Sequence, residues 1–365
     1  MGFESGSISF RAFYLSAGLP EDHVKRFAKH AAPGLDALGR EIVHGWVTGR
    51  HLLDRHITEE TAYHGGYLRL ALMRAERRIP GALLRAECMM EEFAAREAQG
   101  VEFLKRPERA KIRKEVTERL LPTMPPQLSG IPMVCGRRGE ALLAGAMSDK
   151  QIELFAQYFQ TATGVEIVPM TPETAALKRK KRSVRDLDPV SFSPDCPDEE
   201  VAPAIGLDFL TWLWFFSERR GGQFQTAQGE YAVGLEGPLM FVMEGGGAHE
   251  ARLRRGEPLL SAEAKAALMS GKKLRRAKLV MAQNNMQWTA EFDGQDFAFR
   301  GVKLPKGEVM DAASLFQERM LGIQTLIAGV LALYDLFLEE RLDPARWTET
   351  LREVRVWVST RTGKR

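Results

Sequence analysis

A segment with two blocks of opposite charge divides this 365-residue chain into two parts. Residues 178–185 include six basic and no acidic side chains, whereas residues 186–208 include seven acidic and no basic ones. The acidic block also contains four prolines, Pro189, Pro194, Pro197 and Pro203. Because such a composition buries little apolar surface, it predicts disorder rather than a packed core. We therefore expect an N-terminal region, a disordered charged linker and a C-terminal region, at residues 1–171, 172–203 and 204–365.

Apolar periodicity predicts strands and helices on both sides of this linker, without a regular alternation between them. In the N-terminal region we expect strands near residues 8–14, 41–47, 67–76, 131–136, 140–146 and 166–170, and helices near 20–30, 80–99, 107–121 and 149–164. In the C-terminal region we expect strands near 231–235, 239–244, 251–255, 273–282, 286–292 and 297–302, and helices near 208–218, 262–270, 311–340 and 344–358. This mixture favours an α+β fold with mixed antiparallel sheets and long helices.

Two apolar helices bear on solubility and on the core. In residues 208–218, Phe209, Trp212, Leu213 and Phe216 form one stripe, which predicts core packing rather than a base-stacking platform. Residues 320–338 are the most apolar stretch, but the part without charge is shorter than the roughly 20 residues of a membrane span. We predict a buried helix or a helix at a subunit contact there. No signal peptide is visible, and together these features predict a soluble cytoplasmic protein without a membrane partner.

Motifs for enzymes and metals do not occur in the sequence. Gly271-Lys272 lacks the upstream glycine of a phosphate-binding loop, and neither Gly-x-Ser-x-Gly nor His-Glu-x-x-His is found. A metal-dependent nuclease needs paired carboxylates and a lysine, of which Glu263-Ala264-Lys265 is only a fragment. Three cysteines are too far apart for a zinc cluster, and five other potential ligands match no known spacing: His51, Asp54, His56, Glu59 and His64. We predict no catalytic residue, no metal and no cofactor.

Basic residues cluster in three places, although the chain has a net charge of only +3. Residues 252–278 contain nine Lys or Arg and two acids, residues 69–85 contain five arginines and one acid, and residues 101–120 contain seven basic and four acidic residues. Binding to a phosphate backbone requires such concentrated charge, because each neutralised phosphate releases counterions. The alternative is that these clusters are solvated surfaces. The clusters provide four candidate DNA contacts, Arg77, Arg78, Lys273 and Arg275.

Several short segments, taken in their order and spacing, give the chain a family resemblance. They are His44-Gly45-Trp46-Val47, Arg77-Arg78-Ile79-Pro80, Lys114-Glu115-Val116 before Leu120-Leu121-Pro122, Val168-Pro169 and Ser270-Gly271-Lys272. Over most of its length the chain resembles the recombination-associated protein RdgC family. The resemblance implies a horseshoe-shaped protomer in which both regions form one unit. It also implies a nucleoid-associated bacterial protein that binds double-stranded DNA without sequence preference, forms a ring-shaped homodimer with a basic central hole and restrains the RecA recombinase.

The resemblance also implies particular DNA contacts. Carried over residue by residue, these are Arg254, Arg255, Lys272, Arg276, Lys111 and Lys114. The chain departs from the family through its longer 172–203 region and its C-terminal helix. It also has Met124-Pro125-Pro126 where many members have an aromatic residue, at an expected dimer contact. Two alternatives to a DNA-binding protein remain open: a metal-dependent DNA exonuclease, and a protein-interaction scaffold that does not bind DNA.

Overall fold

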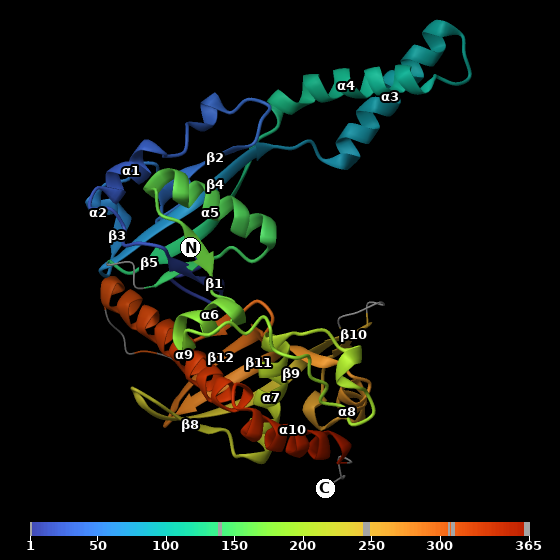
Figure 1. Ribbon diagram of the computed structural model, residues 1–365. Coiled ribbons are helices and arrows are strands. Elements are labelled where there is room, and N and C mark those ends of the chain that lie inside the picture. Colours follow the sequence, from blue (N-terminus) through green and yellow to red (C-terminus); the bar gives the residue numbers. More distant parts are fainter. Residues whose placement is uncertain (1, 138–140, 244–248, 306, 308–310, 361–365) are drawn as a thin grey trace.

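The N-terminal half begins with β1 (Ile8–Leu15), a strand that pairs with both halves of the protein. The computed structural model describes residues 2–137, 141–243, 249–305, 307 and 311–360 (Figure 1). After β1 come α1 (His23–Lys29), β2 (Val43–Thr48), α2 (Glu59–Ala62), β3 (Tyr63–His64), β4 (Tyr67–Arg77), α3 (Gly81–Gln99), α4 (Arg106–Leu120), β5 (Pro126–Cys135), β6 (Leu142–Ala144), α5 (Asp149–Thr163) and β7 (Ile167–Pro169).

The C-terminal half contains the longest helix and the longest strand of the described chain. Its elements are α6 (Pro172–Lys180), α7 (Ile205–Arg219), β8 (Gln223–Thr226), β9 (Gly229–Met243), β10 (His249–Leu253), α8 (Ala262–Met269), β11 (Lys273–Gln283), β12 (Met286–Asp293), β13 (Ala298–Lys303), α9 (Ala312–Arg341) and α10 (Pro344–Ser359). Most of them overlap the elements expected from apolar periodicity. The mixed strands and helices confirm the predicted α+β class.

One thirteen-stranded sheet connects the two halves. Its main path has the order β10-β9-β11-β12-β13-β1-β6-β5-β4-β2, and β3, β7 and β8 pair beside β4, β1 and β9. The ladders between these strands are antiparallel. The junction is β1, whose Phe10 pairs with Phe299 of β13, whereas Arg11 pairs with Ala144 of β6. The two regions therefore share one sheet through β1, and Phe316 of α9 also contacts His64 of β3 and Tyr67 of β4.

An aromatic cluster forms the core of the N-terminal half. Trp46 of β2 contacts Phe27 of α1 edge-on at 4.8 Å between ring centroids, and Phe155 of α5 at 6.0 Å. The strand must approach α1 closely for this contact. A Cβ at Gly45 would lie 2.3 Å from the Cα of Ala32, so only glycine fits beside Trp46. Close packing against Ala32 therefore explains why a glycine stands between His44 and Trp46.

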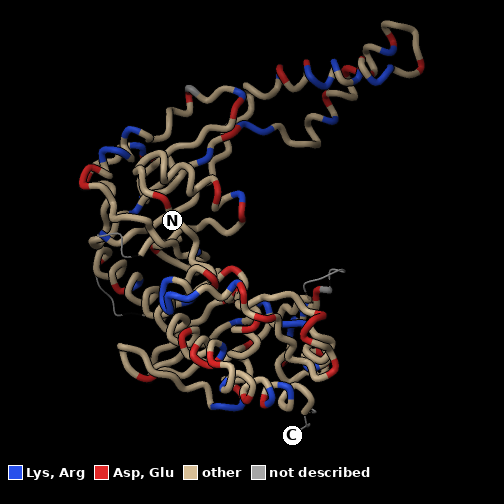
Figure 2. The backbone as a smooth tube through the Cα atoms, in the orientation of Figure 1, with Lys and Arg blue, Asp and Glu red and all other residues tan. Residues whose placement is uncertain are grey.

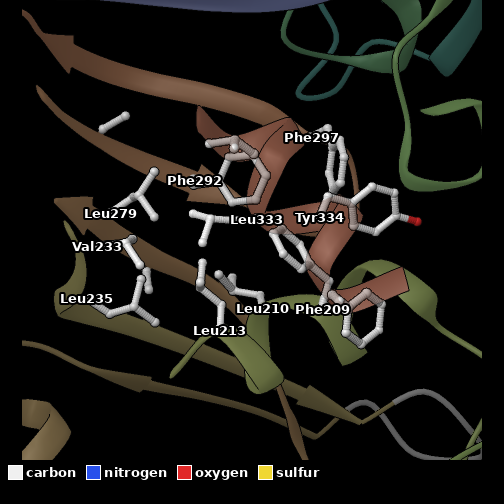
Figure 3. Packing of buried hydrophobic residues seen from close by; sticks show 14 of the residues in the cluster. Phe209, Leu210, Leu213, Val233, Leu235, Leu279, Phe292, Phe297, Leu333 and Tyr334 are labelled. Atoms are coloured by element: carbon white, nitrogen blue, oxygen red, sulfur yellow. The ribbon is translucent and has the colours of Figure 1, made fainter. Parts of the chain in front are cut away.

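The aromatic stripe of α7 lies in the core of the C-terminal half, as predicted. Phe209, Leu210 and Leu213 face the sheet and α9 (Figure 3). Phe209 contacts Tyr334 of α9 edge-on, with 5.1 Å between ring centroids. These rings are shielded from solvent by protein and cannot stack on nucleic-acid bases. The prediction of core packing is confirmed.

The long apolar helix α9 packs against α7 and is partly covered by α10. By length and composition α9 could cross a membrane, but its Ile323, Leu326 and Leu333 are fully buried inside the protein. Trp347 of α10 packs edge-on against Phe337 of α9, at 5.9 Å between ring centroids. One face of α9 is thus buried, whereas Leu321 is 60% exposed, so both predicted alternatives, a buried helix and a helix at a subunit contact, stay open.

The predicted disordered linker is instead packed against the C-terminal half. Residues 172–180 form α6, and Val184, Val190 and Phe192 are buried. Two residues of the basic block pair with distant acids, Arg179 with Asp335 of α9 and Lys180 with Glu339. Lys181, Arg182 and Arg185 of the same block remain exposed. The helix and the buried residues correct the expectation of a disordered linker over residues 172–203.

Helices α3 and α4 form a hairpin that projects away from the sheet (Figure 1). We call it the helical arm. No residue of α3 is fully buried, and Val116 is the one buried residue of α4. Arg119 of α4 joins the two helices by donating to Glu87 and Glu91 of α3, at 2.9 Å each. The arm exposes most of its side chains.

Candidate nucleic-acid interface

The basic residues predicted to contact DNA fall into two groups in the structure. Arg77 and Arg78 lie at the base of the helical arm, and Lys111 and Lys114 lie on its α4. The other six belong to the C-terminal half, on β11 or in the segments beside β10 and β11: Arg254, Arg255, Lys272, Lys273, Arg275 and Arg276. Figure 2 shows Lys and Arg along both helices of the arm.

Most of the predicted contacts on β11 are already paired with acidic residues of the protein. Lys273 is only 4% exposed, and its Nζ lies 2.6 Å from Oδ1 of Asp208, which is buried on α7. Arg276 donates to Asp293, a fully buried carboxylate at the end of β12. Arg275 lies 3.5 Å from Asp293. Lys273 is therefore inaccessible to DNA, and the two arginines have part of their charge compensated.

The rest of the β11 surface is also balanced by charges on neighbouring strands. Lys278 stands opposite Glu236 of β9 on one side and Glu291 of β12 on the other, and Glu291 stands opposite Arg300 of β13. Lys278 Nζ lies 2.6 Å from Glu236 Oε2. Opposite charges that face one another across strands attract, so this row is close to neutral. The basic cluster seen in the sequence is much weaker in the folded sheet.

Three predicted residues of the C-terminal half remain outside these ion pairs. Arg254 and Arg255 are exposed in the segment that follows β10. Lys272 is half-buried before β11, where its Nζ donates to Ser270 Oγ at 3.0 Å. In the described part of the chain none of the three lies within 4.0 Å of a carboxylate. They do not form one site, because β10 and β11 lie on opposite sides of β9.

The predicted residues of the arm are more accessible. Arg78, Lys111 and Lys114 are exposed, and Lys111 makes only a loose pair with Glu115, at 3.9 Å. Arg77 is half-buried and donates to the backbone oxygen of Met124, so it supports the arm's base. This contact fixes Arg77 to the segment before β5. Three of the four predicted arm residues are free to reach a phosphate.

The sequence interpretation missed four arginines that line a groove between α3 and α4. We call it the arginine groove: Arg85 of α3 with Arg106, Arg109 and Arg113 of α4, around a space of about 720 Å³. All four are exposed. The spacing of the three on α4, at i, i+3 and i+7, places them on one helix face and could have revealed them. Their proximity to Arg85 follows only from the hairpin.

The lysine of the candidate nuclease fragment packs against two tryptophans, Trp214 and Trp357. The Nζ of Lys265 lies over the ring of Trp357, 3.4 Å from its centroid, and donates to the Trp357 backbone oxygen at 3.2 Å. Burial lowers the pKa of Lys265 to about 8. Glu218 accepts from both neighbouring indoles, those of Trp214 and Trp357. Lys265 therefore holds α8 against α7 and α10.

No cluster that could hold a metal ion is found among the described residues. In the loop that carries His51 and His56, the Asp54 carboxylate accepts from Thr48 Oγ1 at 2.7 Å and stabilises the turn. Comparison with known proteins adds no assignment: a scan against protein-family models and a search of curated proteins both found no match. The residues themselves therefore carry the functional proposal.

Proposed function

We propose that this protein binds double-stranded DNA without sequence preference and acts as a non-enzymatic clamp on the bacterial nucleoid. The observation that supports it is the accumulation of exposed basic side chains without acidic partners on the helical arm. Charges on the β11 sheet are compensated within the protein, whereas the arm keeps Arg78, Lys114 and the arginine groove available. Such a surface attracts any polyphosphate backbone by counterion release.

The absence of sequence preference follows from the kind of side chain and its setting. Phosphate contacts made by Arg and Lys position a protein on the duplex but carry no base information. Base reading requires an element that enters a groove with side chains aimed at base edges. The sequence contains no zinc-finger or helix-turn-helix pattern. The proposed contact is electrostatic.

The affinity for duplex DNA is expected to fall steeply with salt and to vary little with sequence. If about six phosphates are neutralised, log K against log salt should have a slope of about −5. A titration of several unrelated duplexes at increasing salt measures both properties. Parallel samples with magnesium test for cleavage, which this proposal does not expect. A slope near zero, or strong preference for one duplex, would contradict the proposal.

We further propose that two copies form the clamp. The arm and the C-terminal half extend on the same side of the body, so the backbone has the outline of an open C (Figure 1). The arm also exposes large apolar side chains away from the lining of the groove, which supports a contact with a second copy: Met90, Phe93 and Phe103. A two-fold dimer would bring two basic arms to one duplex and increase affinity through multivalency.

The dimer is expected to be visible in solution at micromolar concentration. Light scattering should give twice the single-chain mass of 40.9 kDa. Replacement of both Met90 and Phe93 by serine should shift the mass towards the monomer, because these side chains are 67% and 56% exposed in one copy. Val356→Ser, at a similarly exposed residue of α10, is the matched control. A monomeric wild-type protein would exclude the dimeric clamp.

The cellular part of the proposal rests on the resemblance to the RdgC family. A protein clamped on duplex DNA occupies the phosphates that a recombinase filament would use. It would therefore restrain RecA-dependent recombination by occupation alone, without a catalytic step. Such a role requires high affinity at cellular salt, which a dimer supplies more readily than a monomer.

A further inference from the structure

The arginine groove is a positive site on the arm whose guanidinium groups have no carboxylate partner among the described residues. In the described part of the protein, no carboxylate lies within 4.0 Å of the guanidinium groups of Arg85, Arg106, Arg109 and Arg113. One acid, Glu92, also lines the groove. On the same helix, Arg119 is held by both Glu87 and Glu91. Because four like charges close together repel one another, an anionic ligand would relieve this repulsion.

The spacing of the arginines suits successive phosphates. With a rise of about 1.5 Å per residue, the first and last arginines of the α4 row, Arg106 and Arg113, are about 10 Å apart along the helix. One DNA strand carries a phosphate about every 3.4 Å along the duplex axis but winds around that axis, so a straight row of this length can contact more than one phosphate of the strand. Arg85 faces them from α3, on the opposite wall of the groove. A single small anion would engage only part of this row.

The residues that line the groove favour a DNA duplex over a single strand as its ligand. Its other lining residues are small or aliphatic, apart from one cysteine and the glutamate already named: Gly81, Leu84, Cys88, Met89 and Ala110. Proteins that bind single strands stack unpaired bases on aromatic rings, and no aromatic ring lines this groove. A duplex keeps its bases stacked internally and presents only phosphates.

We infer that the arginine groove holds the phosphate backbone of one strand of a DNA duplex, and that the protein prefers duplex to single-stranded DNA. This inference rests on the proposed function and assigns it to a specific site. The guanidinium groups donate to phosphate oxygens in charge-assisted hydrogen bonds, with no contact to base edges. Because no aromatic ring among the described residues lines the groove, it offers no surface on which unpaired bases could stack.

The experiment measures binding by the double variant Arg109→Gln/Arg113→Gln. The loss of two phosphate contacts should reduce the steepness of the salt slope by about 2 and weaken duplex binding about 60-fold at 0.1 M salt. Arg346→Gln is the control, because it removes an exposed charge that Asp343 already compensates and that lies on α10, outside the arm. We expect less than a threefold change for this control. Circular dichroism verifies that each variant is folded.

Strand preference is tested with a duplex and a single strand of equal length. Since the salt slope per phosphate is about −0.9 for duplex and −0.7 for single strands, wild-type protein with about six contacts should bind the duplex roughly tenfold more tightly at 0.1 M salt. Tighter binding to the single strand would overturn the inferred preference. Preference for duplex RNA over duplex DNA would overturn the choice of DNA.

The outcomes separate this inference from the proposed function. If wild-type protein does not bind DNA at all, the proposed function fails. If wild-type protein binds DNA and the double variant binds equally well with the same salt slope, the arginine groove is not the site. If the double variant changes the mass measured by light scattering, the groove contacts protein instead of DNA.

Discussion

Asp208→Ala is expected to destabilise the protein by about 3–5 kcal/mol. The carboxylate lies in the first turn of α7, is 2% exposed, and has the Lys273 ammonium 2.6 Å away. Its removal leaves a positive charge without a partner inside the protein, where solvation by water is lost. Urea unfolding of wild type and variant measures the difference.

A double variant shows whether the lost charge partner is the cause. Asp208→Leu/Lys273→Met replaces both ions by apolar side chains of similar size, and should recover most of the lost stability. If the free energy of unfolding of Asp208→Ala is within about 1 kcal/mol of the wild-type value, water solvates Lys273 and the buried ion pair contributes little to stability. Equal destabilisation of the single and double variants would instead indicate a packing defect.

Phe10→Ala is expected to cost about 3–5 kcal/mol, because it removes a fully buried ring at the junction of the two halves. Phe10 stacks on Phe299 of β13, with 5.1 Å between ring centroids. The cavity would lie beside the residues through which β1 changes partners. Thermal or urea unfolding measures the loss.

Phe103→Ala is the control for Phe10, because the same ring is removed from a residue that is 76% exposed in one copy. Measured at a protein concentration low enough to keep the protein monomeric, this variant should change stability by less than about 0.5 kcal/mol. Similar losses from both variants would contradict the burial of Phe10. If the two halves of the Phe10→Ala variant unfold in separate transitions, β1 couples the unfolding of the two halves in the wild-type protein.

The sequence predicts local features of this fold well and distant pairings poorly. The α7 stripe was recognisable because Phe209, Trp212 and Phe216 repeat with the helical period, and that period predicts one buried face. The charged segment after residue 171 was misjudged because its partners, such as Asp335 and Glu339, lie more than 150 residues away. Local composition contains no information about such a partner.

The candidate interface shows the same contrast between local features, which the sequence predicts, and distant pairings, which it does not. Counting charges along residues 252–278 identified a basic cluster, but Asp208, Glu236 and Asp293 neutralise several of its members from other elements. The α4 arginines follow a simple helical spacing and were accessible to sequence reasoning. Arg85 was not, since its position beside them depends on how the hairpin closes.

The shared strand β1 also determines when the protein can finish folding. A nascent chain can pair residues 11–15 of β1 with β6 and β7 once the N-terminal half has left the ribosome. Ser9, in contrast, meets Gly301 across a separation of 292 residues. Until β13 emerges, the first residues of β1 have no strand to pair with, and their edge can bind a chaperone or another unfinished chain. Translation speed through the C-terminal half therefore sets how long this edge stays open.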